Sequence, residues 1–367
     1  MKSCYIHIPF CENICTYCDF CKMYYNSAWA DKYLEQLEYE IKKNYSGEKL
    51  STIYIGGGTP TCLNEQQLEK LLNILNNLNK EDDIEYTIET NIESLNLDKI
   101  KLLKRFGINR VSVGLQSIVS KNINYLGRHH NKQQALQVIK SLQSNGFDNI
   151  NVDLIYALPG QTLDELKEDI DFILQLDIQH ISTYSLIIED NTKLGINNVS
   201  PIDDDLDYHM YKYICKRLQE CGFTHYEVSN FSKDGYESRH NLTYWNNDEY
   251  YGFGLGASGY VGNVRYDNTR SLNKYLIGNY RLNEEEINLN TKIENEFILG
   301  FRKLSGINKE KFKSKYNIEI TNIEVVAKLI NNKSLIDDGI NVCIDPEKIY
   351  VSNSILVEFI GGSYGED

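Results

Sequence analysis

Three cysteines near the start of the chain have the residue type and spacing of metal ligands. Cys11, Cys15 and Cys18 lie four and three residues apart, directly after the apolar run of residues 5–8. Thiolates on one short loop can meet at a soft metal centre, and cysteine thiolates hold iron–sulfur clusters. Because a structural zinc ion usually takes four protein ligands, three cysteines favour a 4Fe–4S cluster that keeps one iron open.

Two other interpretations of these cysteines stay open at this point. Cys21 follows three residues after Cys18, so a closed metal site with four protein ligands is one alternative. A disulfide with spare thiols is the second, which the odd total of nine cysteines disfavours. We interpret the remaining cysteines as ordinary small apolar residues. They are Cys4, Cys62, Cys215, Cys221 and Cys343.

Composition and charge disfavour several classes of protein. The 367 residues are 41% hydrophobic and 25% charged, which suits two globular domains or one large α/β unit with an appendage. The net charge of −14 disfavours generic binding to nucleic acid or to an anionic membrane surface. No run of 18 apolar residues predicts a transmembrane helix, and the first residues lack an apolar signal region. We therefore expect a cytoplasmic protein in a reducing compartment.

Short apolar runs alternate with helical patterns through the first half of the chain. The predicted strands are residues 4–8, 52–55, 84–89, 110–114, 150–154 and 180–186. The predicted helices between them are residues 31–43, 64–79, 98–106, 132–145 and 162–176. Strand–helix alternation of this kind indicates βαβ units and a parallel sheet. Six such units predict an α/β fold, an open and incomplete parallel (β/α)6 barrel, with ligands at the C-terminal ends of its strands.

The pattern changes in the second half. Residues 203–221 predict a long helix, and the Tyr-, Asn- and Gly-rich residues 224–275 show little periodicity, which indicates a site or its cover. From residue 291 the chain predicts three helices, two short strands around Asp345-Pro346, and a last segment at residues 352–359. This pattern resembles a mainly helical, winged-helix-like domain. We predict a barrel at residues 1–190, an α/β extension at 191–285 and the winged-helix-like domain at 286–367.

Glycine and polar residues follow several of the predicted strands. The run GGGTP at residues 56–60 lets backbone amides approach a ligand, although a tight βα turn would also explain it. Glu89 and Gln116 end the next two strands, and Arg128, a natural partner for a carboxylate, comes twelve residues later. Asp153 ends the strand after that. Each residue alone could be a cap or a surface residue, but together they lie where a barrel places its site.

The cysteine spacing, preceded by the run YIHIPF, resembles the signature of the radical SAM superfamily. Within it the chain is similar to the branch of the oxygen-independent coproporphyrinogen III oxidases and the HemW heme chaperones, in register from residue 1 to about residue 231. It departs at residues 90–92, where a proline usually follows the asparagine. The resemblance implies the same barrel, a 4Fe–4S cluster on the three cysteines, and S-adenosylmethionine chelating the open iron through its amino and carboxylate groups.

The resemblance also implies roles for individual residues. Asp19-Phe20 before Cys21 is what the chaperone group shows, so Cys21 is expected not to ligate the cluster. Two tyrosines flanking the cluster and the polar residues at the strand ends are expected to bind S-adenosylmethionine. These residues are Tyr5, Tyr17, Gly57, Gly58, Thr59, Glu89, Gln116, Arg128 and Asp153.

A second motif is the run HNLTYW at residues 240–245. An imidazole can ligate heme iron, and aromatic rings can flank a porphyrin face. A structural histidine in an aromatic loop would explain the run as well. Because the run and the preceding residues 226–231 resemble the heme-binding segment of the chaperones, the resemblance implies that His240 binds heme.

Two functions follow from the resemblance. The first is a heme chaperone that passes heme to apo-hemoproteins such as respiratory cytochromes, with transient contact to membrane proteins and without decarboxylase activity. The second is an oxygen-independent coproporphyrinogen III oxidase, or another radical SAM enzyme acting on tetrapyrroles. The His240 run favours the chaperone, as does the position of Cys11, which leaves no room for the longer N-terminal segment of the oxidases. We assign no catalytic residue.

Overall fold

The computed structural model describes residues 2–364 and is built around one large, mainly parallel sheet. Six parallel strands pair in chain order, as the alternation of strands and helices predicts. They are β1 (Lys2–Ile8), β4 (Leu50–Gly57), β5 (Lys80–Asn91), β6 (Arg110–Gln116), β7 (Ile150–Tyr156) and β8 (His180–Ser185). Every strand lies where a predicted one does, and most run two to four residues longer.

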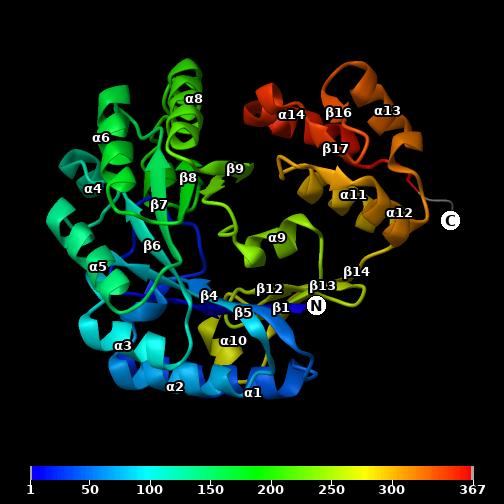
Figure 1. The fold of residues 1–367 in the computed structure, drawn as a ribbon. Coiled ribbons are helices and arrows are strands. Elements are labelled where there is room, and N and C mark those ends of the chain that lie inside the picture. Colours follow the sequence, from blue (N-terminus) through cyan, green and yellow to red (C-terminus); the bar gives the residue numbers. More distant parts are fainter. Residues whose placement is uncertain (1, 365–367) are drawn as a thin grey trace.

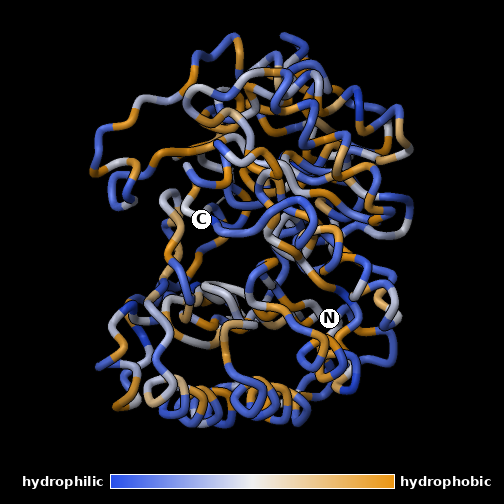
Figure 2. The backbone as a smooth tube through the Cα atoms, turned by 90° about the vertical axis from the view of Figure 1, so that its left-hand side faces the viewer, coloured by the Kyte–Doolittle hydropathy of each residue, from blue (hydrophilic) through white to orange (hydrophobic). Residues whose placement is uncertain are grey.

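Amphipathic helices cover the outer face of these strands (Figure 1). They are α1 (Ser27–Asn44), α2 (Glu65–Asn76), α3 (Leu97–Arg105), α5 (Lys132–Ser144) and α6 (Leu163–Leu174). Each begins after an Asn or Thr whose side chain accepts a backbone N–H of the first turn, and Thr162 forms the predicted capping box with Glu165. In Figure 2 the helices along the lower edge carry both apolar and polar colours, because one face packs on the sheet.

The sheet continues beyond both edge strands of this six-stranded part, β1 and β8, and does not close into a barrel. Beside β1 lie β11 (Tyr250–Phe253), β12 (Ser258–Val261), β13 (Val264–Asn268) and β14 (Arg281–Glu286). Beside β8 lie β10 (Asn230–Ser232) and then β9 (Thr224–Glu227). The incomplete barrel is therefore confirmed, whereas the strands inside the aperiodic residues 224–275 are not among those predicted from the sequence.

Two helices of the second half lie between the barrel and the C-terminal region (Figure 1). α8 (Asp204–Glu220) is the predicted long helix, and the carboxylate of Asp203 accepts the N–H of Leu206 at its start. α9 (Arg239–Trp245) carries the HNLTYW run and contacts both β4 and the first helix of the C-terminal region. Three short helices lie elsewhere: α4 (Ser120–Tyr125) follows β6, α7 (Lys193–Ile196) follows β8, and α10 (Leu272–Leu276) contacts α1.

The C-terminal residues build a second hydrophobic core, in which Phe297, Phe301 and Phe359 pack ring against ring. Its main helices are α11 (Leu289–Gly300), α12 (Lys309–Tyr316) and α13 (Glu324–Asn331). A three-stranded antiparallel sheet consists of β15 (Ile307–Asn308), β17 (Asn341–Ile344) and β16 (Leu335–Asp337). This agrees with the predicted mainly helical domain, while the three domain boundaries remain predictions.

One expectation for this region is wrong. The two short strands end before Asp345, and Pro346 instead begins a 3-10 helix, η4 (Pro346–Val351), followed by α14 (Ser352–Leu356) and η5 (Val357–Phe359). Proline lacks the N–H that a strand ladder needs, and its fixed φ suits the first turn of a helix. Among residues 2–364, no helix is both long enough and apolar enough to cross a membrane.

A buried carboxylate joins α1 to the sheet extension. Glu40 is 0% exposed and accepts hydrogen bonds from the Gly254 N–H at 2.8 Å, the Asn268 amide at 2.7 Å and the Tyr275 hydroxyl at 2.6 Å. Arg281 lies 3.6 Å from the same carboxylate. If the carboxylate were removed, the buried Gly254 N–H and Tyr275 hydroxyl would lose their acceptor, while Asn268 would keep its hydrogen bond to the Gly254 carbonyl.

We predict that Glu40→Ala lowers the free energy of unfolding by about 3 kcal/mol or more, because removing one member of a buried charged network leaves its partners unpaired. Urea titration of the full chain measures the loss. The matched control is Glu35→Ala on α1, the helix that also carries Glu40. It removes an exposed carboxylate that pairs with Lys70 of α2 and should change stability by less than about 0.5 kcal/mol. Equal losses in the two variants would contradict this role for Glu40.

Candidate cofactor site

The cysteine loop lies between two short parallel strands, β2 (Phe10–Cys11) and β3 (Met23–Tyr24). Thr16 fixes its middle, because the backbone N–H donates to the Leu126 carbonyl at 3.1 Å and the hydroxyl donates to the Tyr125 carbonyl at 2.9 Å. Both carbonyls belong to the segment that follows β6. The loop is thereby held over the C-terminal ends of the barrel strands.

Two polar groups point at the sulfur atoms of this loop. The Thr59 hydroxyl donates to Cys11 Sγ at 3.7 Å, and Arg128 Nη1 donates to Cys15 Sγ at 3.9 Å. Burial raises the pKa of Cys11 to about 12 and also raises that of Cys18. A metal centre would therefore have to displace the protons of Cys11 and Cys18.

Among the described residues, no three His, Cys, Asp or Glu side chains converge so that they could share one metal ion. A 4Fe–4S cluster does not need such convergence, since each cysteine binds a different iron of the cube. The donor type also fits, because three thiols lie on one loop. The Arg128 guanidinium and the Thr59 hydroxyl can stabilise negative charge on their sulfur atoms by hydrogen bonds. The residues present are compatible with the cluster.

The glycines after β4 lie against the cysteine loop without room for a side chain. A Cβ on Gly58 would lie 2.6 Å from the Phe10 carbonyl oxygen and 2.9 Å from Cys11 Sγ. Gly57 has φ of +112° and a Cβ there would meet the His7 ring at 2.7 Å, so only glycine fits both positions. A short 3-10 helix, η1 (Pro60–Cys62), then turns the chain away.

Two carboxyl groups lie on the inner face of the barrel. Glu89 accepts hydrogen bonds from the Tyr54 hydroxyl at 2.8 Å and the Gly57 N–H at 3.1 Å. Burial raises the pKa of Glu89 to about 7, and the nearby Asp153 carboxyl adds to the rise. Asp153 accepts from the Asn151 amide at 2.8 Å, and burial raises its pKa as well. Asp153 lies inside β7 rather than at its end, because that strand continues to Tyr156.

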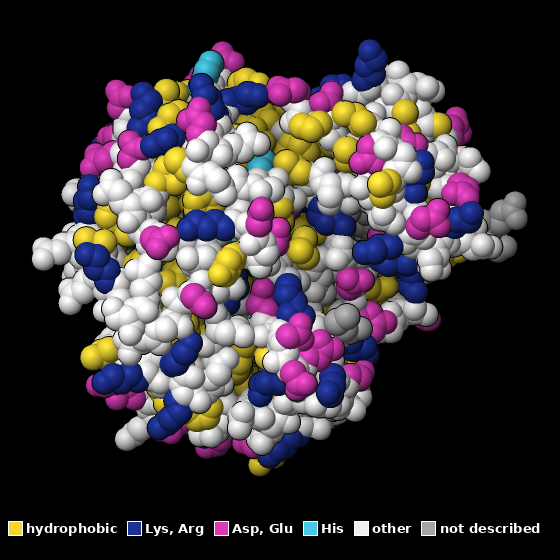
Figure 3. Space-filling view, in the orientation of Figure 1, with side chains coloured by type: hydrophobic (Ala, Val, Ile, Leu, Met, Phe, Trp, Pro, Cys, Tyr) yellow, Lys and Arg dark blue, Asp and Glu magenta, His cyan; other side chains and the backbone are white. Residues whose placement is uncertain are grey.

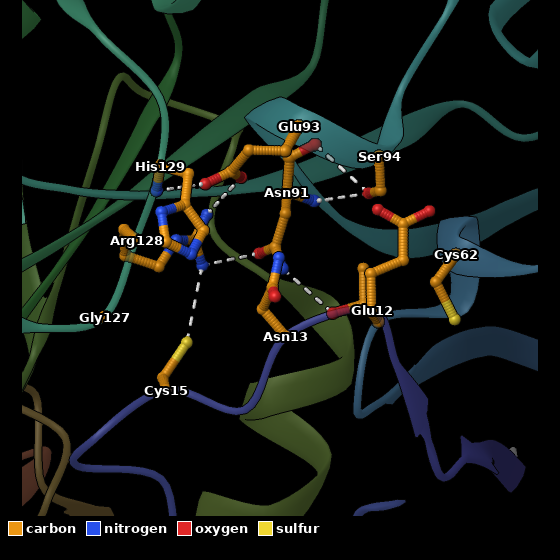
Figure 4. A pocket seen from close by; sticks show the side chains of 11 residues that line it. Glu12, Asn13, Cys15, Cys62, Asn91, Glu93, Ser94, Gly127, Arg128 and His129 are labelled. Carbon is orange, nitrogen blue, oxygen red and sulfur yellow. Dashed lines mark hydrogen bonds and ion pairs between the residues drawn. The ribbon is translucent and has the colours of Figure 1, made fainter. Parts of the chain in front are cut away.

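Arg128 is held by residues that the sequence did not single out (Figure 4). Its guanidinium donates to Asn91 Oδ1 and Glu93 Oε2, both at 2.9 Å, and to the Gly114 carbonyl at 2.8 Å. Glu93 belongs to η2 (Ile92–Ser94), directly after β5. Their position directly after a barrel strand was a usable signal for Asn91 and Glu93.

Glu93 also holds the two histidines after Arg128. It accepts from the His129 N–H at 3.0 Å, and His130 Nδ1 lies 3.3 Å away. Burial alone would raise the pKa of Glu93, but His130 and Arg128 lower it far below its usual range. A permanently ionised Glu93 therefore keeps the guanidinium directed toward the cysteine loop.

Gln116 and Tyr17 complete the predicted ligand set. Gln116 ends β6 with φ of +67°, an unusual conformation for a residue with a side chain, and its buried Oε1 has no hydrogen-bond partner within residues 2–364. An unpaired buried acceptor indicates that a bound group completes this side of the site. The Tyr17 ring packs beside Leu126 and Leu158 at the rim.

Tyr5 and His7 of β1 contact the end of the cysteine loop. The Tyr5 hydroxyl lies 3.0 Å from His7 Nδ1, and His7 Nε2 lies 2.7 Å from the Cys21 carbonyl oxygen, to which it can donate. Burial lowers the pKa of His7 to about 4, so the ring is neutral at pH 7. His7 thus orients the end of the cysteine loop.

His240 is 1% exposed, inside the molecule rather than at its surface. The Glu85 carboxylate accepts the His240 N–H at 2.9 Å and fixes the start of α9. Nδ1 of His240 lies 2.6 Å from the Thr52 hydroxyl and Nε2 lies 2.8 Å from the Tyr244 hydroxyl. Burial lowers its pKa to about 3, and the ring stacks on Tyr54 with centroids 5.0 Å apart. Direct ligation of heme by His240 stays a prediction, and it requires one of these hydrogen bonds to be exchanged for iron.

The cysteine assignment makes a direct prediction. After anaerobic reconstitution the chain should hold about four irons, and Cys11→Ser, Cys15→Ser or Cys18→Ser should lose most of them. Cys21→Ser should keep the full content, as should Cys215→Ser on α8, which lies far along the chain and serves as the control. Full iron in any of the first three variants, or its loss in the Cys21 variant, would contradict the assignment.

The raised pKa of Glu89 makes a second prediction. If the ionised carboxylate binds the ammonium of S-adenosylmethionine, affinity should fall as pH drops below about 7, by up to about tenfold per unit, because the carboxyl is then neutral. Calorimetric titration of the reconstituted chain with S-adenosylmethionine between pH 6 and pH 8 measures this affinity. The range extends about one unit to each side of the pKa of Glu89. Glu89→Gln should bind weakly and lose the pH dependence; an unchanged profile in that variant would remove Glu89 from the role.

Comparisons with known proteins identify the relatives of this chain. Residues 5–173 match the Radical SAM superfamily. The Heme chaperone HemW of Lactococcus lactis is 41% identical over 98% of this chain and 97% of its own length. The Heme chaperone HemW of Bacillus subtilis is 38% identical over 98% of this chain and 100% of its own length. The structure of Coproporphyrinogen III oxidase (HemN) from Escherichia coli matches with a TM-score of 0.86 at 20% identity, covering 98% of this chain and 90% of that one.

These likenesses carry different weight. At 20% identity, the match to the oxidase establishes the fold alone. The match to the Radical SAM superfamily implies a 4Fe–4S cluster and S-adenosylmethionine. The sequence relatives at 41% and 38% identity span nearly all of both chains and share one name. This chain therefore belongs to the HemW heme-chaperone family of the radical SAM superfamily.

Proposed function

We propose that this protein binds heme and passes it to apo-hemoproteins such as respiratory cytochromes, carrying a 4Fe–4S cluster and S-adenosylmethionine at the mouth of its barrel. The observation that carries the proposal is sequence identity of 41% and 38%, over nearly the full length, to two proteins named heme chaperones. The match includes the C-terminal half, where the HNLTYW run lies on a helix between the barrel and the second core.

The cofactor roles follow from the contacts at the barrel mouth. Cys11, Cys15 and Cys18 would hold the cluster, which with S-adenosylmethionine supplies one-electron chemistry when bound. The glycine turn would bring Gly57 and Gly58 against the ligand's amino end, with the Thr59 hydroxyl beside Cys11. These contacts would be made by backbone and by one short side chain.

Charged groups on opposite sides of the mouth would orient the amino-acid part of S-adenosylmethionine. Glu89 suits the ammonium, and Arg128 suits the carboxylate because its planar guanidinium binds carboxylates in pairs of hydrogen bonds. Gln116 and Asp153 would complete the polar wall, while Tyr5 and Tyr17 flank the cluster. Arg128 is already held by Asn91 and Glu93, so the ligand would meet a preorganised cation.

The heme role belongs to α9. We assign heme binding to the segment that contains His240, whose neighbours Tyr54, Tyr5 and Tyr244 form an aromatic wall with ring centroids 5.0 to 6.5 Å from the imidazole. Aromatic rings suit a porphyrin face. All nine cysteines of the chain are free thiols, which suits the cytoplasmic, reducing setting that we include in the proposal. Transient contact with membrane-bound acceptors is part of the same proposal.

Binding to nucleic acid is not part of the proposal. On the face drawn in Figure 3, acidic and basic side chains are intermingled rather than gathered into a basic field. The net charge of −14 also opposes contact with a polyanion.

One observation favours a second candidate function. The fold matches a coproporphyrinogen III oxidase over 98% of this chain, so a radical decarboxylase of porphyrinogen propionates, or another radical SAM enzyme on tetrapyrroles, would have the same barrel mouth. The two functions differ in outcome: the chaperone releases heme unchanged, whereas the oxidase alters its tetrapyrrole.

We predict that the reconstituted chain, loaded with heme, transfers it to an apo-cytochrome within minutes, because a carrier must release its cargo to an acceptor with higher affinity. Absorbance of the acceptor's heme band measures transfer, and free heme at the same concentration is the control. A parallel incubation with coproporphyrinogen, S-adenosylmethionine and reductant should give no decarboxylated product. Formation of that product, with no heme transfer, would overturn the proposal in favour of the oxidase.

A further inference from the structure

A second cavity opens beside the cofactor site, between the cysteine loop and the sheet extension. Its volume is about 450 Å³, within the ~300–1,000 Å³ typical of small-molecule sites. Tyr5 and His7 of β1 line one side, and Cys21 of the cysteine loop lines the top. Tyr244 of α9 and Tyr250 of β11 form the inner wall. The cavity thus lies between α9, which carries the HNLTYW run, and the cysteine loop.

Tyr244, and not His240, is the member of the HNLTYW run that lines this cavity. Its hydroxyl lies 2.8 Å from His240 Nε2, and the other ring nitrogen of His240 lies 2.6 Å from the Thr52 hydroxyl. The Tyr244 ring stands edge-on to Tyr250 with centroids 4.7 Å apart. Thr52, His240 and Tyr244 therefore form a hydrogen-bonded chain from the barrel interior to a residue that lines the cavity.

We propose that ferric heme binds in this cavity with the Tyr244 phenolate as its axial ligand and His240 as the positioning residue behind that oxygen. The inference rests on the proposed function, since it names the iron ligand of the same heme site. Tyrosine oxygen is an established axial ligand of ferric heme iron. In this arrangement Tyr244 binds the heme iron directly, and His240 acts only through Tyr244.

The ligand exchange balances without an external reactant. Ferric heme in neutral water carries hydroxide, and the Fe–O bond to that hydroxide breaks as the bond to the Tyr244 oxygen forms. The phenol proton leaves with the hydroxide as water, so no redox change and no net charge transfer occurs. His240 stays neutral throughout, as its burial requires.

The hydrogen bonds of His240 can serve both states of the phenol. With the phenol intact, Nε2 accepts its proton and Nδ1–H donates to the Thr52 hydroxyl. With the phenolate bound to iron, Nε2–H donates to the phenolate oxygen, and the Thr52 hydroxyl donates to Nδ1. A hydroxyl can donate or accept, so the 2.6 Å contact survives the change of tautomer.

The rim of the cavity suits the other parts of heme. Phe20 and Leu282 are 65% and 54% exposed at its edge, so their apolar side chains are free to cover a porphyrin face. Arg270 also lines the cavity and donates to the Asp19 carbonyl at 3.0 Å. We assign a heme propionate to Arg270. Two aspartates, Asp19 and Asp267, also line the cavity, and Asp267 accepts a hydrogen bond from the Ser258 hydroxyl at 2.6 Å.

The test uses the full-length, reconstituted chain and ferric heme as the probe. Resonance Raman spectroscopy of the wild-type complex should show iron–phenolate and phenolate ring modes, which a histidine-ligated heme lacks. Tyr244→Phe should lose these modes and bind heme at least tenfold more weakly. His240→Gln should keep the modes, shifted in frequency, because the glutamine amide still reaches toward the oxygen. Tyr39→Phe, which removes a hydroxyl from a tyrosine 65% exposed on α1, is the matched control and should behave as wild type.

The outcomes separate this inference from the proposed function. Phenolate modes and wild-type affinity in Tyr244→Phe would assign the iron ligand to another tyrosine, which would overturn the inference and leave the chaperone proposal standing. A histidine-type spectrum of the wild-type complex would do the same without relying on any variant's folding. Failure of the wild-type chain to bind heme at all would overturn the proposed function together with this inference.

Discussion

The backbone of the turn after β4 touches the cysteine loop so closely that no side chain fits between them, and the rest of the site depends on that contact. A Cβ at Gly58 would fall 2.9 Å from Cys11 Sγ, and the Gly58 N–H donates to the Ile8 carbonyl at 2.8 Å. Because β1 and β4 are neighbouring parallel strands, the loops that follow them emerge side by side. The register of two strands therefore sets the distance between the thiols and the ligand-binding turn.

Electrostatics then divides the barrel mouth into two sides. Arg128 is a buried cation whose charge is balanced by Glu93, itself held ionised by His130 and two N–H donors. On the other side, Glu89 is buried without a cationic partner in contact, so burial raises its pKa to about 7. An ammonium would satisfy Glu89, and a carboxylate would meet Arg128. A zwitterionic ligand would therefore meet the buried Glu89 on one side and, on the other, a cation that already pairs with Glu93.

The barrel could be predicted from the sequence because each strand is an apolar run and each helix has a clear N-cap and apolar stripe, as in α2 and α6. The strands β11 to β14 could not, because they are short, and the strand that attaches them to the barrel, β11, pairs with β1 about 250 residues away. The contact of His240 with Thr52 could not be predicted for the same reason. Thr52 lies 188 residues from His240, and only the fold brings them together.

The central claim is that the three cysteines hold a cluster whose open iron faces the ligand site at the barrel mouth. Electron paramagnetic resonance of the reduced, reconstituted chain tests it most directly, recorded with and without S-adenosylmethionine. The account predicts that the cluster signal shifts when the ligand is added, since its amino and carboxylate groups would bind the open iron, and that Arg128→Ala weakens the shift. An identical signal with and without the ligand, at full cluster occupancy, would contradict the account.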